Sequence, residues 1–360
     1  MTTPFAARLA KLRDLLAAQK LDALLVTHPP DWYYLTGFTG EAGALIVERK
    51  KATLITDGRF IVQGKEETAG VRILQHKAGV FAAAGEFLRS AGLRRAGFDA
   101  TQVSVAQHGA LRKAAGRRCK LERTNGLVAR LRIRKDALEL AQMRKAAILA
   151  SEVVEHAIGL LKPGVRELEV AAEIEFQMRR RGASGAAFES IVAFGERAAL
   201  PHARPTDKRL GKNELVVLDL GAILGHYCSD ITRTVYIGTA PKRVKEWYKA
   251  VLEAQSAAIS AVRSGVTAGE VDSAARSTLA KYKLDRFFVH STGHGLGLEV
   301  HEDPRLARGQ KTRLEPGTVI TIEPGIYMPG DGGIRIEDDV AVHEDRSEIL
   351  TRSPRDFIEL

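Results

Sequence analysis

Cysteine is almost absent from this chain, which has only Cys119 and Cys228 among its 360 residues and no Cys-x-x-Cys pair. This scarcity argues against a disulfide framework or a thiolate metal site and favours a reducing compartment. Long hydrophobic runs are missing as well, since no apolar stretch approaches membrane-spanning length and the amphipathic first twenty residues lack the apolar core of a signal peptide. We therefore expect a soluble, cytoplasmic protein that does not enter a membrane.

Aromatic residues are missing where positive charge is densest. The formal net charge is +10, and the section from Leu111 to Lys135 is rich in Arg and Lys but has no aromatic side chain that could stack on bases. Charge runs of this kind usually form a solvated face. Nucleic-acid binding is therefore only a minor alternative at this point.

The first third of the chain alternates helical and strand patterns, which predict an α/β unit with a mixed sheet over residues 1–124. A helix is expected at residues 5–19, strands at DALLVTH, ALIVE, ATLIT and RAGFD, and a helix at HKAGVFAAAGEFLRSAG. The segment PPDWYYLTGFTGEAG is expected to be a loop. Its aromatic residues either form local core or wall a substrate site, and we favour core; they are Trp32, Tyr33, Tyr34 and Phe38.

Acidic residues inside apolar runs are the most informative feature of the rest of the chain. Asp219 lies within the run VVLDLG, and Asp230 follows a hairpin's length later. The stretch VITIEPGIYMPGDGGIRIEDDV repeats this plan with Glu323 and Glu337, and His294 lies between the two pairs. A buried carboxylate without a partner is costly. A single one is usually paired with Arg or Lys, but four carboxylates and a histidine suit hard divalent cations.

The second part of the chain repeats itself at a nearly constant spacing. Two long helical patterns occur twice, and Gly265 follows Gly164 by 101 residues, while Glu323 follows Asp219 by 104. Such offsets indicate an internally duplicated domain. Packing the two halves about a pseudo-twofold axis would bring all four acids to one central cleft, where two pairs of carboxylates would hold two metal ions.

Five motifs carry a resemblance to a known family. In order, LDLG, SDITRT, STGHGLGL, ITIEPGIY and GIRIEDD resemble the five-ligand signature of the pita-bread (M24) metallopeptidases, which include methionine aminopeptidase, aminopeptidase P and prolidase. The segments YLTGFTG and LPHARPTDKRL resemble the prolidase and aminopeptidase P branch. The resemblance implies an α+β fold, with an N-terminal creatinase-like α/β domain (1–124) for capping and dimerisation and a pseudo-twofold duplicated pita-bread catalytic domain (125–360).

The same resemblance implies the ligand set and the cofactors. The metal ligands would be Asp219, Asp230, His294, Glu323 and Glu337, with Asp230 and Glu337 bridging two divalent ions. Oxygen-rich ligation with one imidazole suits manganese, cobalt or zinc and distinguishes them poorly, and manganese is our first choice.

The implied reaction is hydrolysis of an Xaa-Pro bond by a metal-bridging hydroxide. Glu323 would be both ligand and proton shuttle, Tyr327 and Arg335 would orient the ligand carboxylates, and three histidines would surround the substrate, although a lone histidine or a core tyrosine often has only a structural role. These histidines are His202, His290 and His301.

The compact length resembles that of small bacterial and archaeal prolidases, which favours a prolidase acting on Xaa-Pro dipeptides. The alternative is an aminopeptidase P that releases the first residue of longer Xaa-Pro peptides. The filled ligand positions argue against creatinase and against a non-catalytic nucleic-acid or chromatin-binding relative. A homodimer is also implied, in which the segment from Trp32 to Phe38 approaches the site of the partner.

Overall fold

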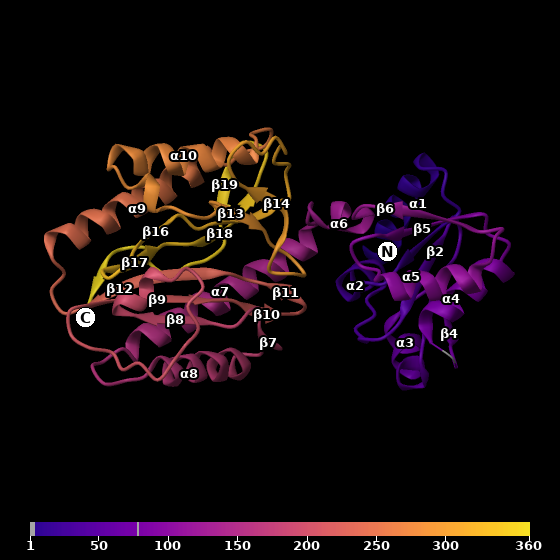
Figure 1. The fold of residues 1–360 in the computed structure, drawn as a ribbon, viewed down its shortest axis with the longest axis horizontal. Helices are drawn as coiled ribbons and strands as arrows, with labels where there is room; N and C mark the ends of the chain where they lie inside the picture. The colour runs from indigo at the N-terminus through magenta and orange to yellow at the C-terminus, as the bar shows by residue number, and fades with distance from the viewer. Residues whose placement is uncertain (1–3, 78) are drawn as a thin grey trace. The chain divides into compact units, whose positions relative to one another are not determined.

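The computed structural model describes residues 4–77 and 79–360 (Figure 1). In it, the first third of the chain folds around one mixed sheet. Clustering of contacts divides the chain into two units, Met1–Arg132 and Ile133–Leu360. None of the described helices has the length and apolar content needed to cross a membrane.

The N-terminal unit has a six-stranded sheet in the order β4-β3-β2-β1-β5-β6. The central strand β1 is antiparallel to β2 and parallel to β5, so the sheet is mixed as the sequence predicts. The helices and strands are α1 (Pro4–Ala18), β1 (Ala23–Val26), α2 (Pro29–Thr36), β2 (Ala44–Glu48), β3 (Ala52–Thr56), α3 (Ile61–Glu67), β4 (Arg72–Gln75), α4 (Val80–Ser90), β5 (Arg95–Asp99), α5 (Val105–Ala115), β6 (Lys120–Thr124) and α6 (Leu127–Arg132).

One local prediction is wrong, because the segment Pro29–Thr36 is a helix and not a loop. Two prolines occupy its first turn, where their missing N–H groups and fixed φ are compatible with a helix. The helix ends at Gly37, whose φ of 81° is left-handed. Trp32, Tyr34 and Phe38 are buried within this unit. These three rings therefore form local core, and they are not free to line a substrate site.

The C-terminal unit contains four more sheets or ribbons and four long helices among its described elements. They are α7 (Ala137–Gly159), α8 (Glu167–Arg180), β7 (Gly185–Ala186), β8 (Ile191–Phe194), β9 (Glu214–Leu220), β10 (Ala222–Leu224), β11 (Tyr227–Cys228), β12 (Ile231–Ile237), α9 (Lys242–Ala261), α10 (Ala268–Lys281), β13 (Gly293–Gly295), β14 (Glu302–Leu306), β15 (Val319–Ile322), β16 (Gly325–Met328), β17 (Gly332–Arg335), β18 (Asp338–Val342), β19 (Ser347–Ile349) and β20 (Ile358–Glu359). Short 3₁₀ helices occur at Gly58–Phe60, Gly195–Ala199 and Asp285–Phe287.

The predicted duplication is visible in equivalent turns of the two halves. Gly164 donates its N–H to the carbonyl of Leu210 at 2.8 Å, and Gly265 donates to Leu314 at 2.9 Å. Both glycines have positive φ, 95° and 83°, which a residue with a Cβ adopts at a cost. In each half a helix pair precedes a set of antiparallel strands, β8-β9-β12 in the first and β13-β15-β18 in the second.

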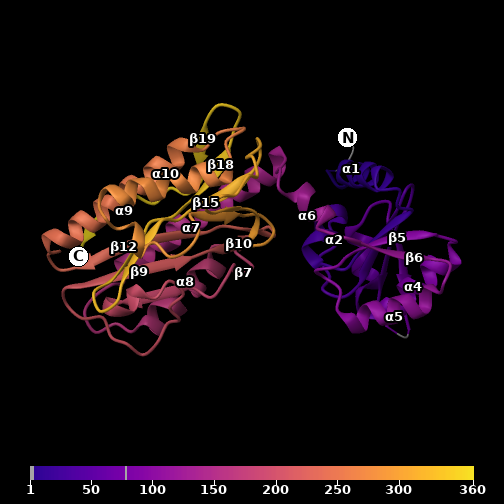
Figure 2. The same cartoon turned by 45° about the horizontal axis from the view of Figure 1, so that its top comes forward.

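The helices lie on the outer sides of these strands. In both ribbon views α8 lies on one side of the strands and α9 and α10 lie on the other (Figures 1 and 2). The apolar face of α7 and α8 packs with Val216, Leu218 and Leu220 of β9, while α9 and α10 pack with Ile320 and Ile322 of β15. Because the apolar faces of the helices cover the outer sides of the strands, polar side chains collect in the space between the two halves.

Candidate metal centre

The first half contributes two acids from the β9–β12 hairpin. Asp219 is the sixth residue of β9, and Asp230 immediately precedes β12. Asp219 is paired in register with Thr232 across the hairpin. Both acids are buried because both faces of these strands are covered. A local apolar sequence therefore fixes two carboxylates where water is scarce.

The second half contributes two acids in equivalent places. Glu323 immediately follows β15, and Glu337 immediately precedes β18. The Glu337 N–H donates to the Thr232 carbonyl at 3.2 Å, and the Thr232 hydroxyl donates to Glu337 Oε2 at 2.5 Å. The two halves are thus joined at the acids themselves.

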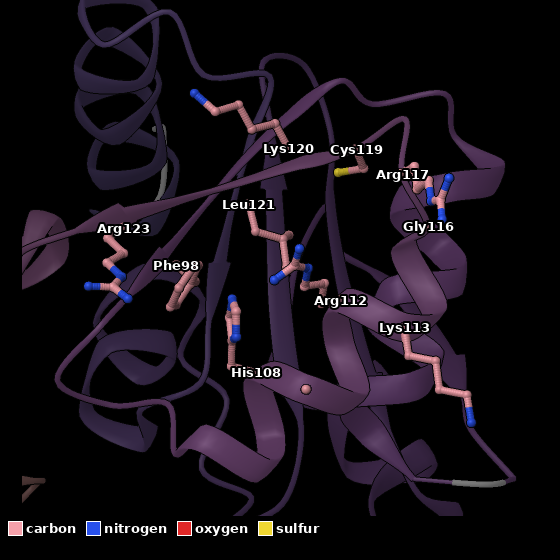
Figure 3. Close-up of a pocket in the computed structure, with 11 residues that line it drawn as sticks. Phe98, His108, Arg112, Lys113, Gly116, Arg117, Cys119, Lys120, Leu121 and Arg123 are labelled. Carbon is pink, nitrogen blue, oxygen red and sulfur yellow. The ribbon is translucent and has the colours of Figure 1, made fainter.

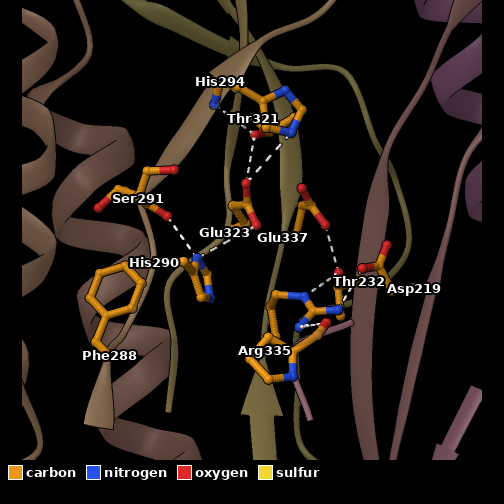
Figure 4. A network of polar contacts seen from close by, with 12 residues as sticks. Asp219, Thr232, Phe288, His290, Ser291, His294, Thr321, Glu323, Arg335 and Glu337 are labelled. Atoms are coloured by element: carbon orange, nitrogen blue, oxygen red, sulfur yellow. Dashed lines mark hydrogen bonds and ion pairs between the residues drawn. The ribbon is translucent and has the colours of Figure 1, made fainter. Parts of the chain in front are cut away.

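These residues meet in one cluster, of which Figure 4 shows Asp219, His294, Glu323 and Glu337. Ligand atoms of Asp230, His294 and Glu337 all lie within 4.8 Å of one another. His294 Nε2 is 3.5 Å from Glu323 Oε1 and 3.7 Å from Asp230 Oδ2. Asp219 lies beside them, in contact with Arg335. All five side chains proposed from sequence as metal ligands are therefore brought to the same place.

The tautomer of His294 can be derived from its contacts. Its Nδ1 lies 3.0 Å from the Gly295 carbonyl, which can only accept, so Nδ1 carries the hydrogen. Nε2 then presents a lone pair toward the acids. Burial lowers the pKa of His294 to about 4, which keeps the ring neutral at pH 7. A neutral imidazole held through its other nitrogen is the form that binds a metal.

The buried acids have too few hydrogen-bond and ion-pair partners to offset the free-energy cost of burying a carboxylate. Burial is the main cause that raises the pKa of Glu323 to about 8, and it raises the pKa of Asp230 and Glu337 well above the usual range, with the neighbouring carboxylates adding to the rise. Asp219 Oδ1 and Asp230 Oδ1 are buried and have no hydrogen-bond partner among the residues that the structure describes. This donor set, four carboxylates and a neutral imidazole, fits divalent cations.

Among the described residues, only one arginine forms an ion pair with a carboxylate of the proposed ligands. Arg335 Nη2 donates to Asp219 Oδ2 at 2.5 Å, while Nε donates to the Thr232 hydroxyl at 3.1 Å and Nη1 donates to Tyr327 Oη at 2.7 Å. Arg233 donates to the backbone carbonyl of Glu337 at 2.6 Å, but its ion pair is with Asp338. One paired positive charge cannot neutralise four carboxylates, so without a metal the acids must bind protons, in line with their raised pKa values.

His290 belongs to the same network. Its Nδ1 donates to the Ser291 carbonyl at 2.8 Å, which leaves Nε2 to accept from the Tyr327 hydroxyl at 2.8 Å. Burial lowers the pKa of His290 to about 4, with Arg335 contributing. The ring is therefore neutral at pH 7 and is fixed beside Glu323, whose Oε2 lies 3.9 Å from Nδ1.

The other two histidines line the site less tightly. The rings of His301 and His294 are 4.4 Å apart. Burial, followed by the charge of His202, lowers the pKa of His301. His202 itself is exposed and follows Pro201, whose carbonyl accepts from Arg335 Nη1 at 3.2 Å. Both side chains are therefore near the acids and accessible from outside.

Three residues of the cluster were not identified from the sequence. Thr232 bonds Glu337, Thr321 Oγ1 accepts the His294 N–H at 3.1 Å, and Asp339 accepts the Asp230 N–H at 3.2 Å. The internal repeat contained a signal for two of them, because Thr232 and Asp339 each lie two residues after an acid at equivalent positions.

The N-terminal unit contains a hollow that is lined by basic residues, unlike the acidic metal centre (Figure 3). It encloses about 900 Å³ between α5 and the edge strand β6, and its floor includes Phe98, Cys119 and Leu121. Arg112, Arg117 and Arg123 stand among its lining residues, none of which is acidic. It therefore offers no carboxylate for metal binding or acid–base chemistry.

Comparison with known proteins agrees with this geometry. Residues 141–344 match the model of metallopeptidase family M24, and residues 8–134 match the creatinase/prolidase N-terminal domain. The chain belongs to metallopeptidase family M24. Its fold is accordingly that of a creatinase-type N-terminal domain followed by an M24 catalytic domain, as the motifs predict.

Several M24 relatives are similar over their whole length. The chain is 37% identical to a Xaa-Pro dipeptidase of Pyrococcus horikoshii over 98% of each chain. It superposes on a Xaa-Pro dipeptidase from Bacillus anthracis with a TM-score of 0.95 and 37% identity, covering 99% of this chain and 100% of that one. An X-Pro aminopeptidase from Thermotoga maritima gives a TM-score of 0.88 and 35% identity, covering 95% and 98%.

Proposed function

We propose that this M24 peptidase is a prolidase that hydrolyses Xaa-Pro dipeptides. The observation that carries the proposal is the buried cluster of four carboxylates and a neutral histidine, which a single arginine leaves largely uncompensated. The names of the relatives described above support the choice of substrate. Release of the first residue from longer Xaa-Pro peptides is the second candidate, because one similar structure is an X-Pro aminopeptidase.

The ligands in this proposal are the five residues of the cluster, with Asp230 and Glu337 shared between two divalent ions. Manganese is our first choice, and cobalt or zinc are the alternatives, because oxygen ligands with one imidazole suit all three. When bound, such ions act as Lewis acids that make water a nucleophile near neutral pH and polarise the scissile carbonyl.

Glu323 is the proposed proton carrier. The nitrogen of an Xaa-Pro bond has no hydrogen of its own, so it must receive a proton before it departs. Glu323 lies among the ligand atoms, with Oε1 3.5 Å from His294 Nε2, so a carboxylate oxygen is beside the place where the attacking water would be held. It would accept the proton of the attacking water and pass it to the proline nitrogen.

The remaining polar residues would hold the substrate and orient the acids. His290, with Nδ1 bonded to the Ser291 carbonyl and Nε2 bonded to the Tyr327 hydroxyl, is rigid enough to position a substrate carbonyl. His202 and His301 would contact the proline side. Tyr327 and Arg335 would fix Asp219 through the bond between Arg335 and that acid.

The N-terminal unit is proposed to cap the site and to form a homodimer, which would limit access to short peptides. The buried rings of Trp32, Tyr34 and Phe38 restrict this role to other residues of the unit. The cytoplasm is the proposed location, because the sequence has only two cysteines and no Cys-x-x-Cys pair, which favours a reducing compartment.

A substrate-length series tests the proposal. After chelator dialysis, the protein would be given manganese, cobalt or zinc and assayed on Ala-Pro, Met-Pro, Ala-Pro-Ala and, as a control, Ala-Ala. We expect kcat/KM for the Xaa-Pro dipeptides to exceed that for the tripeptide at least about tenfold, a difference of about 1.4 kcal/mol. A preference for the tripeptide would identify an aminopeptidase, and no hydrolysis with any metal would contradict both assignments.

A further inference from the structure

Two side chains cross between the duplicated halves in a reciprocal way. Thr232 lies two residues after Asp230, and its hydroxyl donates to Glu337 Oε2. Asp339 lies two residues after Glu337, and its Oδ2 accepts the backbone N–H of Asp230 at 3.2 Å. Each acid proposed to bridge the ions is thus held by the residue that occupies the equivalent position in the opposite half.

Asp339 differs from its neighbour Asp338 although both are almost fully buried. Asp338 is satisfied by Arg233 at 2.8 Å, by the Thr351 hydroxyl at 2.6 Å and by Gln255 at 2.7 Å. Asp339 has only the N–H of Asp230, and its Oδ1 has no hydrogen-bond partner within the described residues. Because successive residues of a strand point to opposite faces, Asp339 is on the side of the metal centre and Asp338 is not.

A buried carboxylate without a compensating charge costs several kcal/mol in its ionised form, so such a group either holds a proton or lies near a cation. No Lys or Arg among the described residues forms an ion pair with Asp339, whereas its one hydrogen bond leads directly to Asp230. That bond places Asp339 directly behind a proposed metal ligand.

We propose that Asp339 is a positioning residue of the metal centre. It holds the turn at Asp230 through the backbone N–H, as Thr232 holds the carboxylate of Glu337. The inference rests on the proposed metal centre, because Asp339 acts on the ions through Asp230 and not as a ligand.

Manganese affinity of the full-length, chelator-treated protein is the first test, measured by titration with Mn²⁺ alone. Asp339→Ala removes the acceptor and the charge and is expected to weaken Mn²⁺ binding about 100-fold, at the upper end of the effect of residues that orient metal ligands. Asp339→Asn keeps an acceptor oxygen and is expected to lose only about tenfold. Asp345→Ala, at an exposed acid of the same unit, should bind as the wild type does.

The stability of the metal-free protein separates positioning from a structural role. Asp339→Asn keeps the size of the side chain and carries no charge that burial would penalise, so denaturant unfolding without metal should show stability at least equal to that of the wild type while Mn²⁺ affinity falls. A side chain needed only for folding would lower both quantities together, and that result would overturn the proposal.

Two further outcomes would also overturn it. One is an Asp339→Ala protein that folds and binds Mn²⁺ within about twofold of the wild type, and the other is an Asn variant as weak as the Ala variant. If the wild-type protein itself binds no Mn²⁺, cobalt or zinc, the proposed metal centre fails instead. Asp339→Ala combined with Thr232→Val should show non-additive losses, because both residues act on the same pair of bridging acids.

Discussion

The two units of the chain differ in how they use charge. Residues 1–132 hold 22 Lys and Arg against 11 Asp and Glu, a formal charge of +11, whereas residues 133–360 hold 32 against 33, a charge of −1. The strongly charged unit has its basic side chains around an open hollow, while the nearly neutral unit has buried acids. The unit with the larger net charge is therefore not the one that holds the proposed active site. The proposed chemistry depends instead on acids that are buried and have few ion-pair or hydrogen-bond partners.

This comparison is tested most severely by removing one of the buried acids. Glu337→Ala deletes a carboxylate proposed to bridge both ions, so we expect at most one bound metal per chain and loss of measurable Xaa-Pro hydrolysis. Metal content by elemental analysis after dialysis against a metal-containing buffer measures the effect. Two tightly bound ions in this variant would remove Glu337 from the bridging role.

A smaller but more specific effect is expected for the proton carrier. Glu323→Gln keeps the shape of the side chain and one oxygen but cannot accept a proton, so kcat should fall about 10²- to 10⁴-fold, the range of general acid–base catalysis. KM should change only a few-fold, and steady-state kinetics at saturating metal separates the two parameters. Turnover close to that of the wild type would contradict the assignment.

A partly exposed ion pair of the same unit provides a contrast with the buried cluster. The side-chain bond from Arg144 is the main cause that lowers the pKa of Glu348 to about 2, with His343 contributing. Because the folded pKa lies below the unfolded value, the pair stabilises the fold above about pH 4.5, and this stabilisation disappears as the pH falls toward 2.

Glu348→Gln should therefore lower the free energy of unfolding at pH 7 by about 0.5 to 1 kcal/mol, as expected for a solvent-screened pair. The difference from the wild type should shrink between pH 5 and pH 2 in denaturant titrations. The Glu348→Gln variant should have the same peptidase activity as the wild type. A difference that grows on acidification would show that another group controls the effect.

The smallest effect is expected in the basic hollow. Changing Arg112, Arg117 and Arg123 together to Gln removes three positive charges that have no carboxylate partner within the described residues. Because the proposed chemistry lies in the other unit, kcat/KM for Ala-Pro should change less than about twofold, or about 0.4 kcal/mol. A tenfold loss would show that charge in the N-terminal unit contributes to catalysis.

The elements that sequence predicted best are those whose pattern is local. The strands ALIVE, ATLIT and RAGFD and the four long helices of the C-terminal unit follow from apolar periodicity and from capping residues such as Asp136 and Thr267. Helix α2 was missed because Pro-Pro was interpreted as a loop signal. Helices α3 and α5 and the strands β4 and β6 were also not predicted, since their sequences are polar and weakly periodic.

By itself, the sequence determined that acids occupy apolar strands, that the strands occur twice and that their motifs belong to the M24 family, because composition and spacing are properties of the chain alone. Only the tertiary structure decided which partners each acid has. Asp338 and Asp339 are adjacent in sequence, yet one is neutralised by Arg233 and the other is not. That difference depends on side chains about a hundred residues away, brought close by the packing of the two halves.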